Sequence, residues 1–70
     1  MSEEKSTIAK NVKKYRKKLG ISQDKLSKLS NVAYNTIIKI ESGATYNPRV
    51  ETLKKIADAL KVRIDDLMKT

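Results

Sequence analysis

Residues 22–43 read SQDKLSKLSNVAYNTIIKIESG and contain two short amphipathic segments separated by a single break. Ser22 is suited to cap the start of a helix, and Asp24 stands in the first turn, where its charge favours the helix dipole. That first helix is expected to end near Ser30. Asn31 tolerates a positive φ angle better than other non-glycine residues, so a tight turn is expected there. The second helix is predicted over residues 34–42, and Gly43 ends it.

The two predicted helices each have an apolar side and a polar side. The residues expected to pack between them are Leu26, Leu29, Val32, Ile37 and Ile40. Ser27 is the small residue that lets the helices approach, and Glu41 lies at one flank of the packed side. The opposite face of the second helix carries Asn35, Lys39 and Ser42, with Tyr34 and Ile38 beside them.

Three further helices are predicted outside this pair. Apolar residues at Ile8, Val12, Tyr15 and Leu19 have helical spacing, with Ser6 or Thr7 as the cap and residues 1–5 expected to be disordered. A fourth helix is predicted at about residues 49–61. Asp65 and Asp66 open a short fifth helix. The sequence therefore predicts one all-α domain of five helices over residues 1–70, with an aliphatic core because Phe and Trp are absent.

The composition narrows the classes of function. Sixteen Lys and Arg against eight Asp and Glu give a formal net charge of +8, which favours DNA, RNA or an anionic membrane as a partner, although a basic surface can also serve solubility. The chain has no Cys and no His, so disulfides, a zinc finger and the commonest catalytic bases are not expected. We therefore expect no metal, no cofactor, no small-molecule ligand and no enzymatic activity.

The chain has no apolar run approaching the ~20 residues of a membrane span, and its polar N-terminus lacks a signal-peptide core. A cytoplasmic, nucleoid-associated protein without a membrane partner is expected. Five lysines (10, 13, 14, 17 and 18) cover the outer face of the first predicted helix. That face is either solvated or in contact with phosphates or anionic lipid. Arg16 stands at the edge of the apolar stripe and can turn inward.

Two short helices joined by a tight turn form a helix-turn-helix unit, whose second helix enters the DNA major groove. The string S-Q-x2-L-S-x3-N-V-x3-T-I-x2-I-E-x-G-x4-P, over residues 22–48, resembles the lambda-repressor-like helix-turn-helix family of the Xre/Cro type. Flanking matches are RKKLG before it and VETLKKIADALKV-x-IDDL after it. The resemblance spans about residues 8–68 and implies a compact five-helix lambda-repressor-like domain that binds DNA.

The resemblance assigns roles to individual residues. Gln23 matches a residue that hydrogen-bonds a DNA phosphate, and Arg16 and Glu41 match a pair that forms a salt bridge. The positions expected to read bases are Ala33, Tyr34, Asn35 and Lys39, to which Ile38 is added as a possible contact to a thymine methyl. The positions expected to contact the phosphate backbone are Ser22, Gln23, Thr36, Ser42, Tyr46, Asn47 and Arg49.

Several positions leave alternatives open. Asn31 replaces the usual glycine of the turn, and Ala33 removes a side-chain cap worth ~1 kcal/mol. Tyr34 packs over the turn or meets DNA, and Ile38 touches a base or is a stray apolar surface residue. Gln23, Asn35 and Lys39 are either DNA contacts or ordinary exposed polar residues.

The resulting hypothesis is a sequence-specific regulator of transcription, a repressor, that binds double-stranded DNA as a homodimer on a near-palindromic operator. The expected dimer surface is Ile64, Leu67 and Met68, because the last short helix has more apolar residues than it can bury alone. The alternative from another class is a protein-binding adaptor or antitoxin component, which should present an apolar face on the third helix. RNA binding is a weaker third option, because no aromatic stacking platform on strands is evident.

Overall fold

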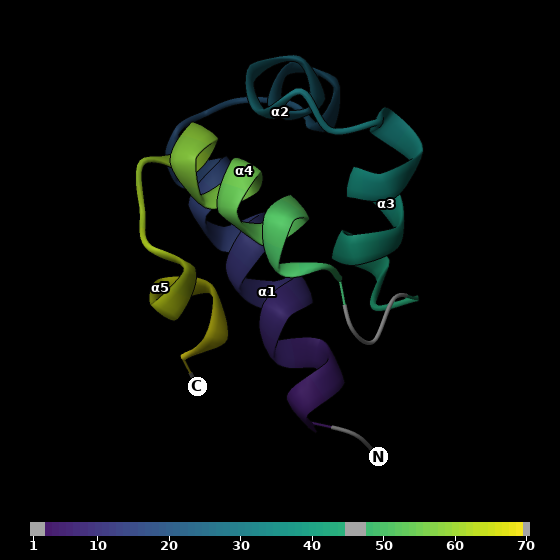
Figure 1. The fold of residues 1–70 in the computed structure, drawn as a ribbon, viewed down its shortest axis with the longest axis vertical. Coiled ribbons are helices and arrows are strands. Elements are labelled where there is room, and N and C mark those ends of the chain that lie inside the picture. The colour runs from purple at the N-terminus through teal and green to yellow at the C-terminus, as the bar shows by residue number, and fades with distance from the viewer. Residues whose placement is uncertain (1–2, 45–47, 70) are drawn as a thin grey trace.

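Five α-helices make up the computed structural model of this chain, which describes residues 3–44 and 48–69 (Figure 1). No strand occurs in those residues, so the predicted all-α class is confirmed. The helices are α1 (Glu3–Lys18), α2 (Gln23–Ser30), α3 (Tyr34–Ser42), α4 (Val50–Leu60) and α5 (Ile64–Met68).

The ends of α2 and α3 follow the predicted capping residues. The Ser22 Oγ accepts a hydrogen bond from the Lys25 backbone N–H at 3.0 Å. Asn31 has φ 59° and Gly43 has φ 81°, so both helices end on a left-handed residue. Ala33 provides no side-chain cap for α3, as expected from its methyl group. Local sequence chemistry therefore accounts for the start of α2 and for the ends of both central helices.

α1 begins at Glu3, ahead of the predicted cap at Ser6 or Thr7. The sequence from Glu3 to Lys5 consists of good helix formers without a breaker, so the helix continues into a segment for which disorder was expected.

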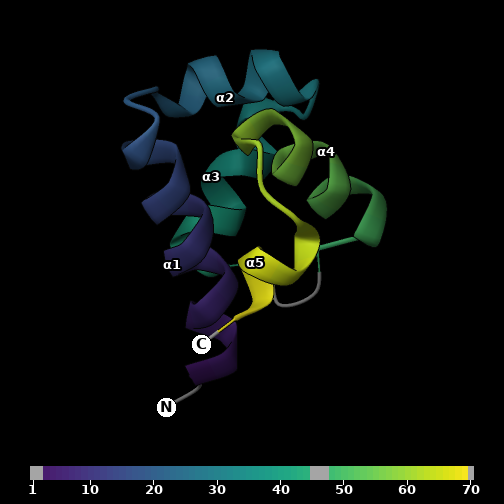
Figure 2. The same cartoon turned by 90° about the vertical axis from the view of Figure 1, so that its left-hand side faces the viewer.

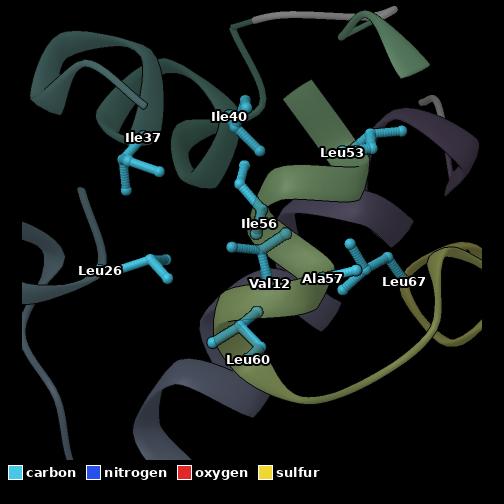
Figure 3. Packing of buried hydrophobic residues seen from close by; sticks show 9 residues of the cluster. All are labelled: Val12, Leu26, Ile37, Ile40, Leu53, Ile56, Ala57, Leu60 and Leu67. Atoms are coloured by element: carbon cyan, nitrogen blue, oxygen red, sulfur yellow. The ribbon is translucent and has the colours of Figure 1, made fainter. Parts of the chain in front are cut away.

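Nine aliphatic residues, contributed by all five helices, form one core (Figure 3). They are Val12, Leu26, Ile37, Ile40, Leu53, Ile56, Ala57, Leu60 and Leu67. α3 packs on both α1 and α2, α4 packs on α2, and α5 packs on α1 and α4 (Figures 1 and 2). One side of α3 therefore packs against α1 and α2, and its opposite side faces outward.

Two leucines predicted to face the core are exposed instead. Leu29 is 53% exposed, because the inward side of α2 is formed by Leu26, Ser27 and Ser30. The hydroxyls of the two serines are hydrogen-bonded to backbone carbonyls of α2, because Ser27 Oγ donates to the Asp24 carbonyl and Ser30 Oγ donates to the Leu26 carbonyl. Leu19 is exposed because α1 has already ended at Lys18, so its side chain leaves the apolar stripe.

The C-terminal end of the described chain is fastened to α1 by Asn11. The Asn11 Nδ2 donates to the Leu67 carbonyl at 2.8 Å and to the Lys69 carbonyl at 2.7 Å. These carbonyls lie at the end of α5, where no further helical turn can bond them. Among the described residues, no helix combines the length and the hydropathy that a membrane span requires.

Candidate nucleic-acid interface

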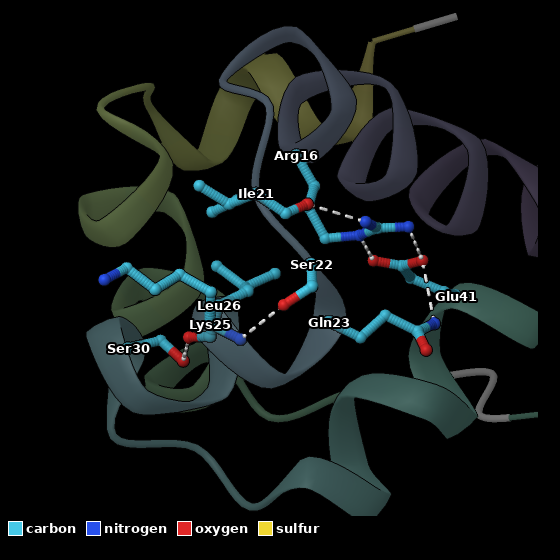
Figure 4. A network of polar contacts seen from close by, with 8 residues as sticks. All are labelled: Arg16, Ile21, Ser22, Gln23, Lys25, Leu26, Ser30 and Glu41. Atoms are coloured by element: carbon cyan, nitrogen blue, oxygen red, sulfur yellow. Dashed lines mark hydrogen bonds and ion pairs between the residues drawn. The ribbon is translucent and has the colours of Figure 1, made fainter.

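A buried carboxylate joins the three helices that surround the turn. Glu41, on the inner side of α3, has a side chain only 2% exposed. Arg16 of α1 donates from Nε to Glu41 Oε2 at 2.6 Å and from Nη2 to Oε1 at 3.0 Å (Figure 4). The structure thus brings together the Arg16–Glu41 pair that the family resemblance implies. The pair is bidentate, with two N–H···O bonds, and this geometry makes such pairs strong.

The same two residues also reach α2 and the segment before it. Arg16 Nη1 donates to the Ile21 carbonyl at 2.8 Å, and Gln23 Nε2 donates to Glu41 Oε1 at 3.1 Å. Glu41 therefore accepts hydrogen bonds from α1 and from the first residue of α2 while standing on α3 (Figure 4). Sequence reasoning missed the Gln23–Glu41 bond, because two residues 18 positions apart give no local signal of contact.

Gln23 keeps a capacity to bind a second group. An amide NH2 carries two donors, so one N–H can hold Glu41 while the other donates to a phosphate. The Ser22 hydroxyl is similarly placed, since its oxygen accepts the capping bond and its proton can still be donated outward. Both residues lie at the N-terminus of α2, where the helix dipole favours an anion.

The outer face of α3 presents the predicted base-reading residues to solvent. Asn35 and Lys39 are exposed, as are Tyr34 (46%) and Ile38 (37%). Asn35, Ile38 and Lys39 share one side of the helix because they stand three and four residues apart. Ala33 is exposed just before α3 begins. The face is therefore accessible and chemically mixed, with polar and apolar groups intermingled.

The predicted phosphate contacts are unevenly placed. Ser42 is exposed, but its Oγ donates to the Lys39 carbonyl at 3.0 Å and accepts from the Ala44 N–H at 3.3 Å, so its hydroxyl proton is already used within the chain. Thr36 is half-buried, whereas Arg49 is exposed immediately before α4. Tyr46 and Asn47 lie outside the described residues.

The predicted dimer surface is only partly available. Leu67 is 0% exposed and belongs to the core of its own chain, so it cannot also meet a second copy. Ile64 is half-buried against that core, and Met68 is 52% exposed. The expectation for Leu67 is wrong because α5 docks on α1 and α4 and buries its central leucine there.

No cluster of three or more acidic, His or Cys side chains that could hold a metal ion occurs among the described residues. Within the part of the chain that the structure describes, the pKa of Asp66, at the start of α5, is displaced. The Arg63 backbone N–H donates to Asp66 Oδ2 at 3.0 Å and lowers the pKa of that carboxyl below its ordinary value of 3.8, with a smaller contribution from Lys69. This group stabilises the end of the fold and lies outside the α2–α3 pair.

Comparison with known proteins gives results that agree with this geometry. A family model described as "Helix-turn-helix" matches residues 12–67. The chain is 37% identical over 60 residues to the HTH-type transcriptional regulator SlrR of Bacillus subtilis, a match that covers 86% of this chain and 40% of SlrR. The chain therefore spans well under half the length of that relative.

Two archaeal relatives are matched over most of their length. Both are uncharacterized HTH-type transcriptional regulators of Archaeoglobus fulgidus, 38% and 34% identical over 56 residues. Each match covers 80% of this chain, with 79% and 78% of the respective relative. No solved structure gives a significant match. The family model, these relatives and the five-helix architecture together show that the chain belongs to the lambda-repressor-like helix-turn-helix family.

Proposed function

We propose that this chain is a sequence-specific regulator of transcription that binds double-stranded DNA, with α3 in the major groove. The observation that carries the proposal is the exposed α3 face, held at a fixed angle to α2 by the buried Glu41. Asn35 can pair with adenine through two hydrogen bonds, and Lys39 can donate to guanine O6 and N7. Membership of a helix-turn-helix family and the names of the relatives support the same function.

The phosphate contacts in this proposal position the domain without reading sequence. Gln23 and the N-terminus of α2 meet one phosphate group, and Arg49 before α4 meets the backbone on the other side of the groove. The net charge of +8 adds a long-range attraction that weakens as salt rises.

The proposed active form is a homodimer on a near-palindrome. Each chain has one α3, so reading two half-sites about 34–36 Å apart requires two copies. We place the contact between copies at α5, where Met68 is exposed and Ile64 is accessible at the edge. Repression is the proposed output, because occupancy of the operator by the bound domain suffices to exclude other proteins.

A second candidate function is a protein-binding adaptor or antitoxin component. The observation that favours it is the exposure of Tyr34 and Ile38 on the same face as Asn35. Those two side chains would anchor a partner protein in place of a base pair.

The test is selection from random duplex DNA with the full chain, repeated at two salt concentrations. Enrichment of a palindromic motif at both concentrations is the expected result. Recovery of unenriched DNA at both would reject sequence-specific binding and favour the adaptor function.

A further inference from the structure

The structure contains a cleft of about 410 Å³ that lies beside, and not on, the predicted reading face. One wall is α1 and the other is the C-terminal end of α3, which pack side by side (Figures 1 and 2). The lining residues of α1 are Ala9, Lys10, Lys13, Lys14 and Lys17, and those of α3 and its C-cap are Glu41, Ser42 and Gly43. We call the four lysines of this wall the cleft lysines.

The cleft lysines form a single row of positive charge. Their spacing of three, one and three residues places all four on one side of α1, and each is exposed. Among the described side chains none of them has an acidic partner within salt-bridge distance, whereas Lys28, Lys54 and Lys69 each have one. The Lys14 Nζ lies 5.6 Å from the ring centre of Tyr15, and this contact leaves the charge of Lys14 unneutralised.

The one carboxylate in the lining does not cancel this charge. Glu41 is already bonded by the guanidinium of Arg16 and by the amide of Gln23, so its negative charge is compensated from the protein side. An anion entering the cleft therefore meets four ammonium groups, and the repulsion from Glu41 is largely offset by Arg16.

The position of the cleft connects it to the proposed DNA surface. Ser42 lines the cleft and also stands on the outer side of α3, while Glu41 links the cleft floor to the first residue of α2. A DNA strand that runs along α3 and past Ser42 would continue over the cleft lysines. The row from residue 10 to residue 17 is about 10 Å long at 1.5 Å per residue, which matches roughly three phosphates at ~3.4 Å of helix axis each.

We propose that the cleft lysines are a second phosphate-binding site, which takes the DNA backbone flanking the segment read by α3. The proposal rests on the proposed function and extends its footprint. A membrane surface fits less well, because the cleft is concave and its lining holds no aromatic or large aliphatic residue that could insert among acyl chains.

The test compares two variants of the full chain that carry the same charge change. The cleft variant is Lys10→Gln, Lys13→Gln, Lys14→Gln and Lys17→Gln together. The control is Lys54→Gln, Lys55→Gln, Lys61→Gln and Lys69→Gln, all exposed on or next to α4 and α5. Circular dichroism melts check that both remain folded, as exposed lysines allow.

The measurement is the dependence of DNA affinity on salt between about 50 and about 200 mM, on the selected motif with about one helical turn (~10 bp) of flanking duplex on each side. Loss of three phosphate contacts should make the slope of log affinity against log salt shallower by about 2–3 for the cleft variant. Its affinity loss across that range should then be ~40-fold smaller than that of the parent. The slope of the control should differ from that of the parent by less than about 1, which corresponds to about one phosphate contact.

Each other result is decisive. Equal slopes for the two variants would overturn the cleft site and leave the proposed function standing, because long-range charge would then explain both. A parent that binds no duplex at all would overturn the proposed function and this inference with it. Removal of the flanking duplex should abolish the difference in salt slope between the cleft variant and the control. A difference in slope that persists on the trimmed duplex would contradict a contact with flanking DNA. Loss of binding to phosphatidylserine vesicles by the cleft variant, with unchanged DNA binding, would reassign the lysines to a membrane.

Discussion

Gln23 and Glu41 are joined by a hydrogen bond of 3.1 Å that runs from the start of α2 to the buried side of α3. The residue expected to hold a DNA phosphate is therefore held itself by the carboxylate that Arg16 also binds. The proposed phosphate contact of Gln23 and the orientation of α3 would therefore depend on the same buried carboxylate.

Glu41→Ala should destabilise the fold by about 3–5 kcal/mol, because it leaves the mostly buried guanidinium of Arg16 without its counter-charge. Urea denaturation followed by circular dichroism measures the change in the free energy of unfolding. The matched control is Glu51→Ala, which removes an exposed carboxylate from α4 and should change stability by less than about 0.5 kcal/mol. Similar small effects for both variants would show that the Glu41 network contributes little.

Gln23→Ala should weaken DNA binding by about tenfold or more without changing base preference, because a hydrogen bond to a charged group contributes about 1.5–3 kcal/mol. The measurement is affinity for a panel of operator variants. Gln23→Glu serves as a companion, since it places a second carboxylate beside Glu41 and opposite the phosphate and should bind still more weakly. A shift in the preferred base would contradict a phosphate role.

Asn35→Ala should relax the preference at one base pair of each half-site and reduce affinity for the preferred base by about 1–3 kcal/mol. Selection from random duplexes with the variant, compared with the parent, gives the base profile. An unchanged profile would remove Asn35 from the residues that read bases.

Asn11→Ala should destabilise the domain by about 1–3 kcal/mol, because it removes the donor that satisfies the carbonyls of Leu67 and Lys69. Lys18→Ala, an exposed change on the same helix, is the control. Thermal melts of both variants supply the comparison. A loss no larger than that of the control would mean that solvent replaces the Asn11 amide without penalty.

The pKa of Asp66 is lowered chiefly by the hydrogen bond from the Arg63 backbone N–H, so folding favours its ionised form. The resulting stabilisation is fully present above the ordinary pKa of 3.8 and is lost as the pH falls through the lowered value in the folded protein. Asp66→Asn should therefore reduce the acid sensitivity of stability below about pH 4. Parallel acid titrations of the parent and the variant that superimpose would contradict this assignment.

The helix order and the ends of α2 and α3 could be predicted because capping residues act locally. Ser22, Asn31 and Gly43 each meet a geometric requirement of the adjacent backbone, whatever packs around it. The exposed face of α3 followed from helical spacing alone, as did the burial of Ile37 and Ile40.

The failures concern side chains whose burial or bonding depends on how the helices pack, which helical spacing alone does not reveal. Leu29 is apolar and correctly spaced, yet the small inward serines of α2 leave it outside. Leu67 looked available for a second copy, because its burial depends on α1 and α4 docking against α5. The role of Asn11 was missed because its two acceptors lie 56 and 58 residues further along the chain.

The two hydrogen bonds from Asn11 to the end of α5 have a consequence for the order of folding. A contact between residues 56 and 58 positions apart closes most of the chain into a loop, and the entropy lost in closing it must be recovered by other contacts first. The slot for Leu67 exists only once α1 and α4 have come together. We therefore expect α5 to dock last and to open first, so that its amide protons exchange with solvent well before those of α2 and α3.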